Sequence, residues 1–371
     1  MNNPTPIKKW VSHKLDSKVE RALQRLAMSR DVSTVAVMPD VHLAGDVCNG
    51  VVVATQELIY PQCVGNDIGC GYLSADLEVA DRDSMSNLAE LWNGIRQSVP
   101  INKHRDRPGF ETEIELSDLI LQKSALRDGR LQLGTLGRGN HFVELQQDER
   151  GGLSLLIHSG SRSMGQSISA WHLRNAEVDQ RSGLKFLAAE SESGKAFLND
   201  MVWARKYAVA NRLEMLGAIE EQVLAPMGIE IDCDSMLHLD HNHVQQEVHD
   251  GNSLWVHRKG AQGLIQNQVS VIPGSMGSTT FVVEGRGHVE SMGSCSHGAG
   301  RSMSRKEAAK RISVRMLRRE TEGVVLDQRR MKTLIDEAPS AYKDIRKVMK
   351  AQKDLVRIVG RREPVLNFKG R

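Results

Sequence analysis

The sequence has no long hydrophobic run, and its cysteines are few and irregularly spaced. No segment reaches the roughly 18 consecutive apolar residues of a membrane-spanning helix, so we expect no association with a membrane. The amino-terminal segment carries scattered charges and no apolar core of a secretion signal. Five cysteines, an odd number, do not indicate a disulfide framework. These absences predict a protein of the reducing cytoplasm.

The sequence also lacks the close-spaced ligands of a structural zinc site. Five histidines end predicted strands or lie beside glycine, namely His42, His141, His158, His241 and His297. None of them belongs to a CxxC or HxxxH motif, so any metal site would have to be assembled from distant segments. The stretch PGSMGS at 273–278 has neither the lysine nor the spacing of a P-loop. Its successive backbone N–H groups could nevertheless hold an anion.

The chain has 371 residues, of which 40% are apolar, so it can bury a substantial core. We see no repeat of fixed period and no Ser- or Pro-rich linker between two halves. We therefore predict one α+β domain over 1–371, with central mixed or antiparallel sheets surrounded by helices. Its carboxyl-terminal portion, about 301–362, is predicted to be basic and helical.

Apolar spacing predicts the individual elements. Helices are expected at 17–29, 83–99, 193–224, 304–319 and 342–358. Strands are expected at 32–40 (ending at the proline), at 51–55, from within PQCVGNDIG, at 153–158, at 253–260 and at 279–285.

The charge is unevenly distributed. The net charge is only +3, yet residues 301–371 contain 21 Lys and Arg against 9 Asp and Glu. A basic segment on an otherwise acidic body is typical of a surface that faces phosphates. The pattern fits equally a set of helices with solvated basic faces.

The stretch VGNDIGCGY places a carboxylate and a thiol three residues apart among glycines, as Asp67 and Cys70. Thiolate and imidazole ligands favour zinc, iron or manganese over magnesium or calcium. The glycines would fix the turn so that both ligands arrive preorganised. The alternative is that Cys70 is a small buried apolar side chain and Asp67 caps the turn.

The stretch HGAGR places His297 before two glycines and Arg301, and Ser304 is a candidate N-cap for the following helix. A helix amino terminus beside an arginine favours phosphate. A histidine there could form a covalent bond to phosphorus, since imidazole can act as a nucleophile. The alternative is a tight glycine turn that begins a surface helix.

These segments form one ordered pattern. It comprises MPDVH (38–42), VGNDIGCG (64–71), GTLGRGNHFVE (134–144), HSGSR (158–162), DHN (240–242), HRKGA (257–261), PGSMG (273–277), HGAGR-x-MSR (297–305), DEAP-x-AYKDI (336–345) and a final Lys-Gly. The pattern resembles the RtcB-type RNA ligases, also called tRNA-splicing ligases, and spans most of the chain.

The resemblance implies a ligase that depends on GTP and two manganese ions. It would join an RNA 3′-phosphate or 2′,3′-cyclic phosphate to a 5′-hydroxyl, through a guanylyl-histidine and an activated RNA–ppG end. The substrates would be broken tRNA or rRNA, in tRNA splicing or RNA repair. A release-factor-like protein is a further partner that such relatives suggest.

The resemblance also implies the site residues. Cys70 would bridge both metal ions, with His158 and His241 completing one site and Asp67 and His141 the other. His297 would be the nucleophile. The nucleotide would be held by Asn140, His141, Phe142, Val143, Glu144, His241, Asn242, Pro273, Gly274, Ser275, Met276, Thr280, Gly298, Ala299, Gly300, Tyr342 (stacked on guanine) and Lys369. Contacts to RNA or the transferred phosphate are expected from Asp40, Arg162, Arg301 and Arg305.

The sequence departs from the family pattern in a few places. HLAGDVCNG replaces a more glycine-rich stretch after MPDVH, and Asn66 and Tyr72 flank the cysteine motif where other residues are usual. These changes bear on which RNA is used. Two other readings remain: an RNA-end-binding module that no longer ligates, and a metal-dependent phosphoesterase that opens cyclic phosphates without His297.

Overall fold

Two large β-sheets form the centre of the molecule. The computed structural model describes residues 5–12, 14–79, 87–107 and 109–371. A five-stranded sheet has the order β1 (Ile7–Lys9), β2 (Val32–His42), β3 (Asn49–Thr55), β12 (Asn252–Lys259), β11 (Asn242–His249). A seven-stranded sheet has the order β10 (Ile229–Asp240), β5 (Gly71–Val79), β7 (Leu153–Ser159), β6 (Phe142–Asp148), β17 (Val356–Lys369), β15 (Thr280–Gly285), β14 (Val269–Ile272). The described pairings are antiparallel except β1 with β2, which confirms the predicted α+β class.

Two smaller sheets complete the β structure. One pairs β13 (Ala261–Gly263) with β16 (Ser294–Ser296). The other has the order β4 (Leu58–Ile59), β9 (Lys185–Ala188), β8 (Glu177–Val178).

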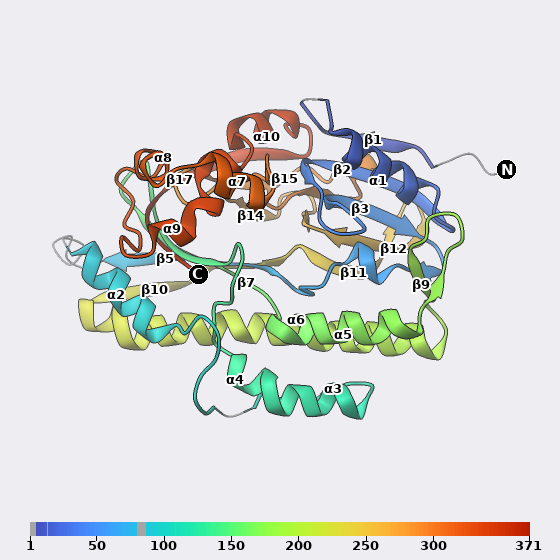
Figure 1. Ribbon diagram of the computed structural model, residues 1–371, viewed down its shortest axis with the longest axis horizontal. Helices are drawn as coiled ribbons and strands as arrows, with labels where there is room; N and C mark the ends of the chain where they lie inside the picture. The colour runs from blue at the N-terminus through green and yellow to red at the C-terminus, as the bar shows by residue number, and fades with distance from the viewer. Residues whose placement is uncertain (1–4, 13, 80–86, 108) are drawn as a thin grey trace.

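Helices cover the strands from two sides (Figure 1). The long α6 (Glu192–Ile219) runs beside α5 (Arg162–Asn175) beneath the strands, with α2 (Leu88–Ser98), α3 (Leu119–Ser124) and α4 (Arg130–Gln132) near them. On the opposite side lie α1 (Ser17–Ala27), α7 (Arg305–Arg311), α8 (Val314–Glu320), α9 (Met331–Leu334) and α10 (Ile345–Ala351). Short 3₁₀ or π segments occupy Pro61–Cys63, Ala125–Gly129, Glu220–Leu224, Ala225–Met227, Val289–Ser291, Ile335–Glu337 and Pro339–Ala341. Within the described ranges, no helix is long and apolar enough to cross a membrane.

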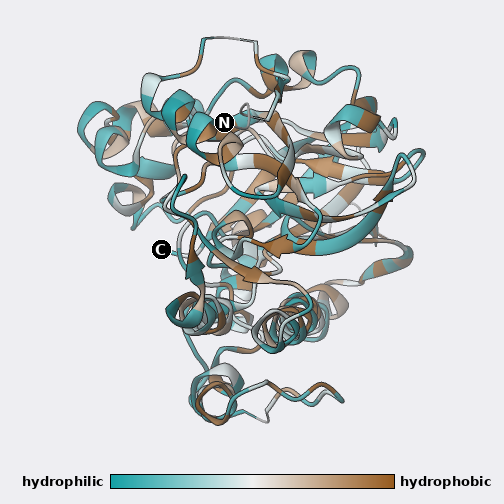
Figure 2. Ribbon diagram, turned by 90° about the vertical axis from the view of Figure 1, so that its right-hand side faces the viewer, coloured by the Kyte–Doolittle hydropathy of each residue, from teal (hydrophilic) through white to brown (hydrophobic). Residues whose placement is uncertain are grey.

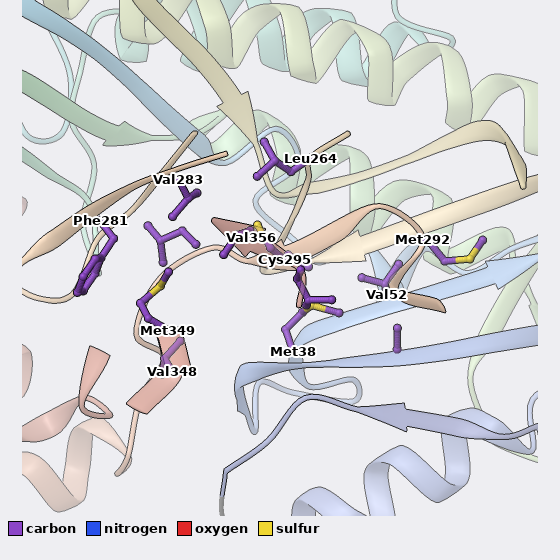
Figure 3. Close-up of a cluster of buried hydrophobic side chains, with 14 of the residues drawn as sticks. Met38, Val52, Leu264, Phe281, Val283, Met292, Cys295, Val348, Met349 and Val356 are labelled. Atoms are coloured by element: carbon purple, nitrogen blue, oxygen red, sulfur yellow. The ribbon is translucent and has the colours of Figure 1, made fainter. Parts of the chain in front are cut away.

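Shared hydrophobic clusters join the sheets. Figure 3 shows one of them, to which β2 and β3 of one sheet, β15 and β17 of the other, and α10 all contribute. A second cluster lies where α2 and α6 pack on the seven-stranded sheet. Full burial of each large aliphatic side chain stabilises the fold by about 1.5–3 kcal/mol. Figure 2 shows the hydrophobic stretches concentrated in the central strands, with striped helices around them.

Several predicted elements have different boundaries in the structure. The strand expected to stop at Pro39 continues to His42, with an irregular register beyond Val37 that accommodates the proline. PQCVGNDIG does not begin a strand: Pro61–Cys63 is a 3₁₀ turn, and the strand begins only at Gly71. Of the helix predicted at 83–99, residues 83–86 lie outside the described ranges and α2 begins at Leu88.

The carboxyl-terminal portion is less helical than predicted. The helix expected at 304–319 divides into α7 and α8, because Ser313 interrupts it and caps the second helix by accepting from the N–H of Met316 at 3.2 Å. The helix expected at 342–358 ends at Ala351. From Val356 the chain is strand β17, which pairs with β6 and β15 in the seven-stranded sheet. These long-range partners outweigh the local helical pattern.

Candidate active site

The glycine-rich turn before β5 orients Asp67 and Cys70. The N–H of Cys70 donates to the carbonyl of Asp67 at 3.1 Å, and Gly69 has a φ of +74°, which favours glycine. A Cβ on Gly71 would lie 2.1 Å from the carbonyl oxygen of Leu239, so only glycine fits there. Asn242 fastens the turn to the next segment by donating to the carbonyl of Asp67 at 3.0 Å. The glycines therefore serve a stiff turn that rests on neighbouring backbone.

Neighbouring strands bring the distant histidines to this turn. The order β10-β5-β7-β6 is continuous in the sheet. His241 follows β10, Cys70 precedes β5, His158 lies in β7, and His141 precedes β6. The ends of these four strands lie level with one another, because Asp240 pairs with Gly71, and Tyr72 and Phe142 both pair with His158. The predicted assembly from separate segments is thus a consequence of strand register.

The donor atoms of this cluster lie close together. Cys70 Sγ is 3.4 Å from His141 Nε2 and 3.3 Å from His158 Nε2. The ligand atoms of these three residues all lie within 4.8 Å of one another, and each residue is buried. Asp67 Oδ2 is 3.0 Å from His141 Nε2. The His241 ring centroid lies 5.3 Å from that of His158, so it borders the same cluster.

The hydrogen bonds of His141 indicate which kind of ligand this cluster can bind. Its Nδ1–H donates to the carbonyl of Leu136 at 2.9 Å. In the neutral ring, Nε2 then carries a lone pair toward the carboxylate of Asp67 and the sulfur of Cys70. Lone pairs that converge in a buried space are stabilised by a cation between them. His241 Nδ1 is also buried, with no hydrogen-bond partner among the described residues. The donor set of carboxylate, thiol and imidazoles therefore fits a divalent transition metal.

Burial sets the pKa values at the cluster. Burial raises the pKa of the Cys70 thiol well above its ordinary value, and the charge of Asp67 raises it further. Burial holds the pKa values of His158 and His241 well below their usual range, so both rings are neutral ligands at physiological pH. Burial also tends to raise the pKa of Asp67, but the neighbouring groups, chiefly His141 and Arg162, together outweigh burial and the pKa is lowered. A thiolate at Cys70 thus requires a bound cation.

His297 lies beside this cluster with one nitrogen fixed. It follows β16, and its ring centroid is 4.6 Å from that of His241. Its Nδ1–H donates to Asp40 Oδ2 at 2.6 Å, and its backbone N–H reaches the same oxygen at 3.2 Å. The Asp40 carboxylate therefore selects the tautomer in which Nε2 is free for chemistry. This is the geometry of an oriented imidazole nucleophile.

A cleft of about 880 Å³ opens over His297. Its walls contain most of the residues predicted to hold a nucleotide, together with His158, Tyr72 and both Arg301 and Arg305. These predicted residues are Asn140, Phe142, Glu144, Pro273, Gly274, Ser275, Met276, His297, Gly298, Ala299, Gly300, Tyr342 and Lys369. They come from five separate parts of the chain, so the fold brings them together.

Other predicted residues lie elsewhere. Val143 points into the hydrophobic cluster under α2 and α6, because residues alternate along β6, and so only its backbone could face a ligand. Thr280 is buried and accepts from Gln146 at 2.8 Å. The amide of Asn242 is occupied by Asp67 and by the N–H of Gly260. Arg162 donates to Thr135 Oγ1 at 3.1 Å, close to the loop that precedes His141.

Asp40 requires a correction. We expected it among the contacts to RNA or phosphate, but its carboxylate is fully buried beneath His297. A carboxylate would also repel a phosphate. Its position instead assigns it to the orientation of His297. Lys343 reinforces this arrangement by donating to the carbonyls on either side of Asp40, those of Pro39 at 2.9 Å and Val41 at 2.6 Å.

Glu144 lines the cleft at the base of β6. Burial raises its pKa to about 7, although two amides donate to it: Gln146 at 2.7 Å and Asn367 at 2.6 Å. A buried carboxyl group held by amides in the wall of a cleft is suited to a specific polar contact with a ligand.

Three of the predicted cationic residues, Lys369, Arg301 and Arg305, converge on one buried carboxylate that the sequence did not single out. Glu337 accepts from Lys369 Nζ at 2.8 Å, from the Tyr342 hydroxyl at 2.6 Å and from Arg301 at 3.3 Å. Arg305 also pairs with it. Together these charges hold the pKa of Glu337 at about 2, even though burial alone would raise it. Glu337 is the second residue of the DEAP motif, but nothing in that motif indicated its role.

Two further residues support the metal cluster and were not predicted. The Tyr72 hydroxyl donates to the backbone carbonyl of His297 at 2.9 Å, and its ring centroid is 4.6 Å from that of His158. Arg212, on α6, is 1% exposed and donates to the carbonyls of Gly69 at 3.0 Å and Ser159 at 2.8 Å. Knowledge of the β5–β7 register would have pointed to Tyr72. No sequence signal distinguishes Arg212 from other helix arginines.

Comparison with known proteins gives the family. The chain matches the family model described as tRNA-splicing ligase RtcB over residues 22–123 and 110–370. It is 34% identical over 406 residues to RNA-splicing ligase RtcB1 of Escherichia coli (strain ATCC 25922), covering 98% of this chain and 97% of the relative. It is also 34% identical to RNA-splicing ligase RtcB of Escherichia coli (strain K12), with 98% and 97% covered. RNA-splicing ligase RtcB2 of strain ATCC 25922 is 29% identical, with 96% and 93% covered. The chain belongs to the RtcB family.

Proposed function

We propose that this RtcB-family RNA ligase joins RNA 3′-phosphate or 2′,3′-cyclic phosphate ends to 5′-hydroxyl ends, using GTP and manganese. The observation that carries the proposal is His297, whose free nitrogen faces a cleft beside a buried Cys–His donor cluster. An oriented imidazole next to a cation site is suited to attack on phosphorus.

His297 acts first. The hydrogen bond to Asp40 keeps the ring proton of His297 on Nδ1, so the lone pair is on Nε2. This lone pair attacks the α-phosphorus of GTP, and a P–N bond forms. Pyrophosphate leaves with the electron pair of the broken P–O bond. The RNA 3′-phosphate then displaces histidine from phosphorus to give RNA–ppG. The 5′-hydroxyl of the second RNA attacks that activated end, and GMP leaves.

Asp67, Cys70, His141, His158 and His241 would hold the metal. Bound manganese would neutralise the charge that develops on the phosphate oxygens. Arg212 keeps the backbone beside Cys70 in place, and Tyr72 holds the backbone of His297. The buried neutral histidines retain their lone pairs for the metal at physiological pH.

The remaining cleft residues bind the two substrates. Tyr342, Lys369 and Glu144 would surround guanine, and the 273–276 loop with Gly298–Gly300 would face the phosphates of GTP. Arg162, Arg301 and Arg305 would pair with the RNA phosphates. The exposed arginines of α8 extend this basic surface. Broken tRNA or rRNA in the cytoplasm is the proposed substrate, and a release-factor-like protein is the proposed partner in repair.

The test is self-guanylylation. Purified protein is incubated with α-³²P-GTP and manganese and run on a denaturing gel beside His297→Ala. A labelled band that needs both manganese and His297 supports the proposal. If the wild type takes no label, the ligase mechanism is refuted. If His297→Ala still opens cyclic phosphate ends, a phosphoesterase is the better description.

A further inference from the structure

A fully buried carboxylate joins two parts of the cleft. Glu337 is 0% exposed, and its two oxygens face different groups. Oε2 accepts from the Tyr342 hydroxyl and from Lys369 Nζ. Oε1 accepts from Arg301 at 3.3 Å and from Arg371 at 3.0 Å, and it also pairs with Arg305. One side chain thus contacts groups that approach from three separate segments.

Each of these contacts is a donor to the carboxylate. Lys and Arg have no acceptor, and the Tyr342 hydroxyl is directed at Oε2. Lys369, whose side chain is 5% exposed, meets Glu337 where water has little access, so an unpaired ammonium there would be costly, whereas Arg305 is partly exposed to solvent. The positions of Tyr342 and Lys369 therefore depend on the charge of Glu337, to which Arg301 and Arg305 are also joined.

We infer that Glu337 is a positioning residue that holds the guanine-facing pair, Tyr342 and Lys369, in register with the phosphate-facing pair, Arg301 and Arg305. The inference rests on the proposed function, which supplies the two ligands. Glu337 touches neither ligand itself. The affinity for the nucleotide would therefore depend on Glu337, a fully buried residue.

The neighbouring Asp336 provides a matched control. Its Oδ2 accepts from Arg305 at 2.8 Å and from Arg371 at 2.7 Å, and its backbone carbonyl accepts from Arg301 at 2.7 Å. No contact joins Asp336 to Tyr342 or Lys369 in the described part of the chain. Asp336→Asn therefore removes the same formal charge from the phosphate-facing side alone.

The experiment compares Glu337→Gln with Asp336→Asn in the full chain. Glutamine keeps the size of the side chain, but its amide group must oppose donors where the carboxylate accepted them. Calorimetry with GMP and manganese gives the nucleotide Kd, and initial rates of guanylylation give KM and kcat for GTP. Thermal melting establishes that each variant is folded.

We expect Glu337→Gln to raise the GMP Kd by at least about tenfold, the loss typical of charged hydrogen bonds. KM for GTP should rise similarly while kcat changes less, because His297 and Asp40 are not contacted. Asp336→Asn should leave the GMP Kd within about twofold and raise KM for the RNA 3′-phosphate. Glu337→Asp, which keeps the charge, should recover part of the affinity.

The inference is overturned if folded Glu337→Gln binds GMP within about twofold of wild type, or if both variants lose nucleotide affinity equally. If Glu337→Gln does not fold, Tyr342→Phe decides, since it removes only the hydroxyl that faces Oε2. It should weaken GMP binding by about threefold or more, and unchanged binding overturns the inference. Failure of the wild type to bind GMP refutes the proposed function itself, and the inference with it.

Discussion

Replacing Asp40 by asparagine should slow guanylylation without weakening GTP binding. The Asp40 carboxylate is 0% exposed and accepts both N–H groups of His297, at 2.6 Å and 3.2 Å. It lies beneath the histidine and does not line the cleft. An amide in its place is neutral, and one of its orientations would oppose the Nδ1–H with a donor. Nε2 of His297 would then no longer be held in the unprotonated form that can attack phosphorus.

The structure sets the size of the effect. A hydrogen bond to a charged group contributes about 1.5–3 kcal/mol, and each 1.4 kcal/mol changes a rate about tenfold. We therefore expect Asp40→Asn to lower the guanylylation rate roughly 10- to 150-fold. The short contact and the burial of the pair favour the upper part of this range.

The assay is single-turnover guanylylation with α-³²P-GTP at saturating manganese. Asp46→Asn is the control, because this aspartate lies on the following loop, is exposed, and its side chain accepts only from Gln62 at 3.0 Å among its described contacts. It should react at the wild-type rate. A rate for Asp40→Asn within about threefold of wild type, or a loss confined to KM, would show that Asp40 does not orient the nucleophile.

Three further predictions follow from the same geometry. Cys70→Ser should weaken manganese binding by at least about tenfold in calorimetry, since a hydroxyl replaces the thiolate, and unchanged affinity would place the metal elsewhere. Burial lowers the pKa of His257 from 6.5 to about 4. As the pH falls from 6.5 to about 4, the unfolded chain therefore binds a proton at His257 that the folded chain does not, and the stability of the folded protein decreases. Urea unfolding at pH 7 and pH 5 measures how much the free energy of unfolding falls between the two pH values. This fall should be about 2 kcal/mol smaller in His257→Gln than in the wild type, and an identical pH dependence in both proteins would contradict the prediction. Charge reversal at Arg318 and Arg319, both exposed on α8, should reduce the salt slope of RNA binding by roughly 1.4. Arg127→Glu should leave it unchanged, because Arg127 belongs to the segment between α3 and α4, which lies on the far side of α5 and α6 from α8 (Figure 1).

Short-range patterns predicted much of the fold. Helical spacing located α1 and α6, because amphipathic periodicity reports directly on burial. The same reasoning misplaced the residues after Pro61 and after Ala351. Strand β17 is stabilised by β6 and β15, which precede it by many residues, and no local pattern contains that information.

The sequence by itself determined which chemistry was available. The order of its motifs indicated the family, and the types of residue, a thiol with imidazoles and a histidine among glycines, indicated a transition metal and a nucleophile. What the sequence did not contain was the partner of each side chain. Asp40 was expected among the contacts to RNA or phosphate, and its buried contact to His297 was not foreseeable.

Only the tertiary structure decided which groups meet. The register of β10, β5, β7 and β6 places the metal donors at one edge of a sheet, and the packing of the last strand against the 336–342 segment surrounds Glu337 with cations. Burial then changes the properties of the same residues: histidines stay neutral, a thiol resists ionisation and a carboxylate keeps its charge. Residue types set the possible reactions, and long-range contacts set the distances and the dielectric in which they occur.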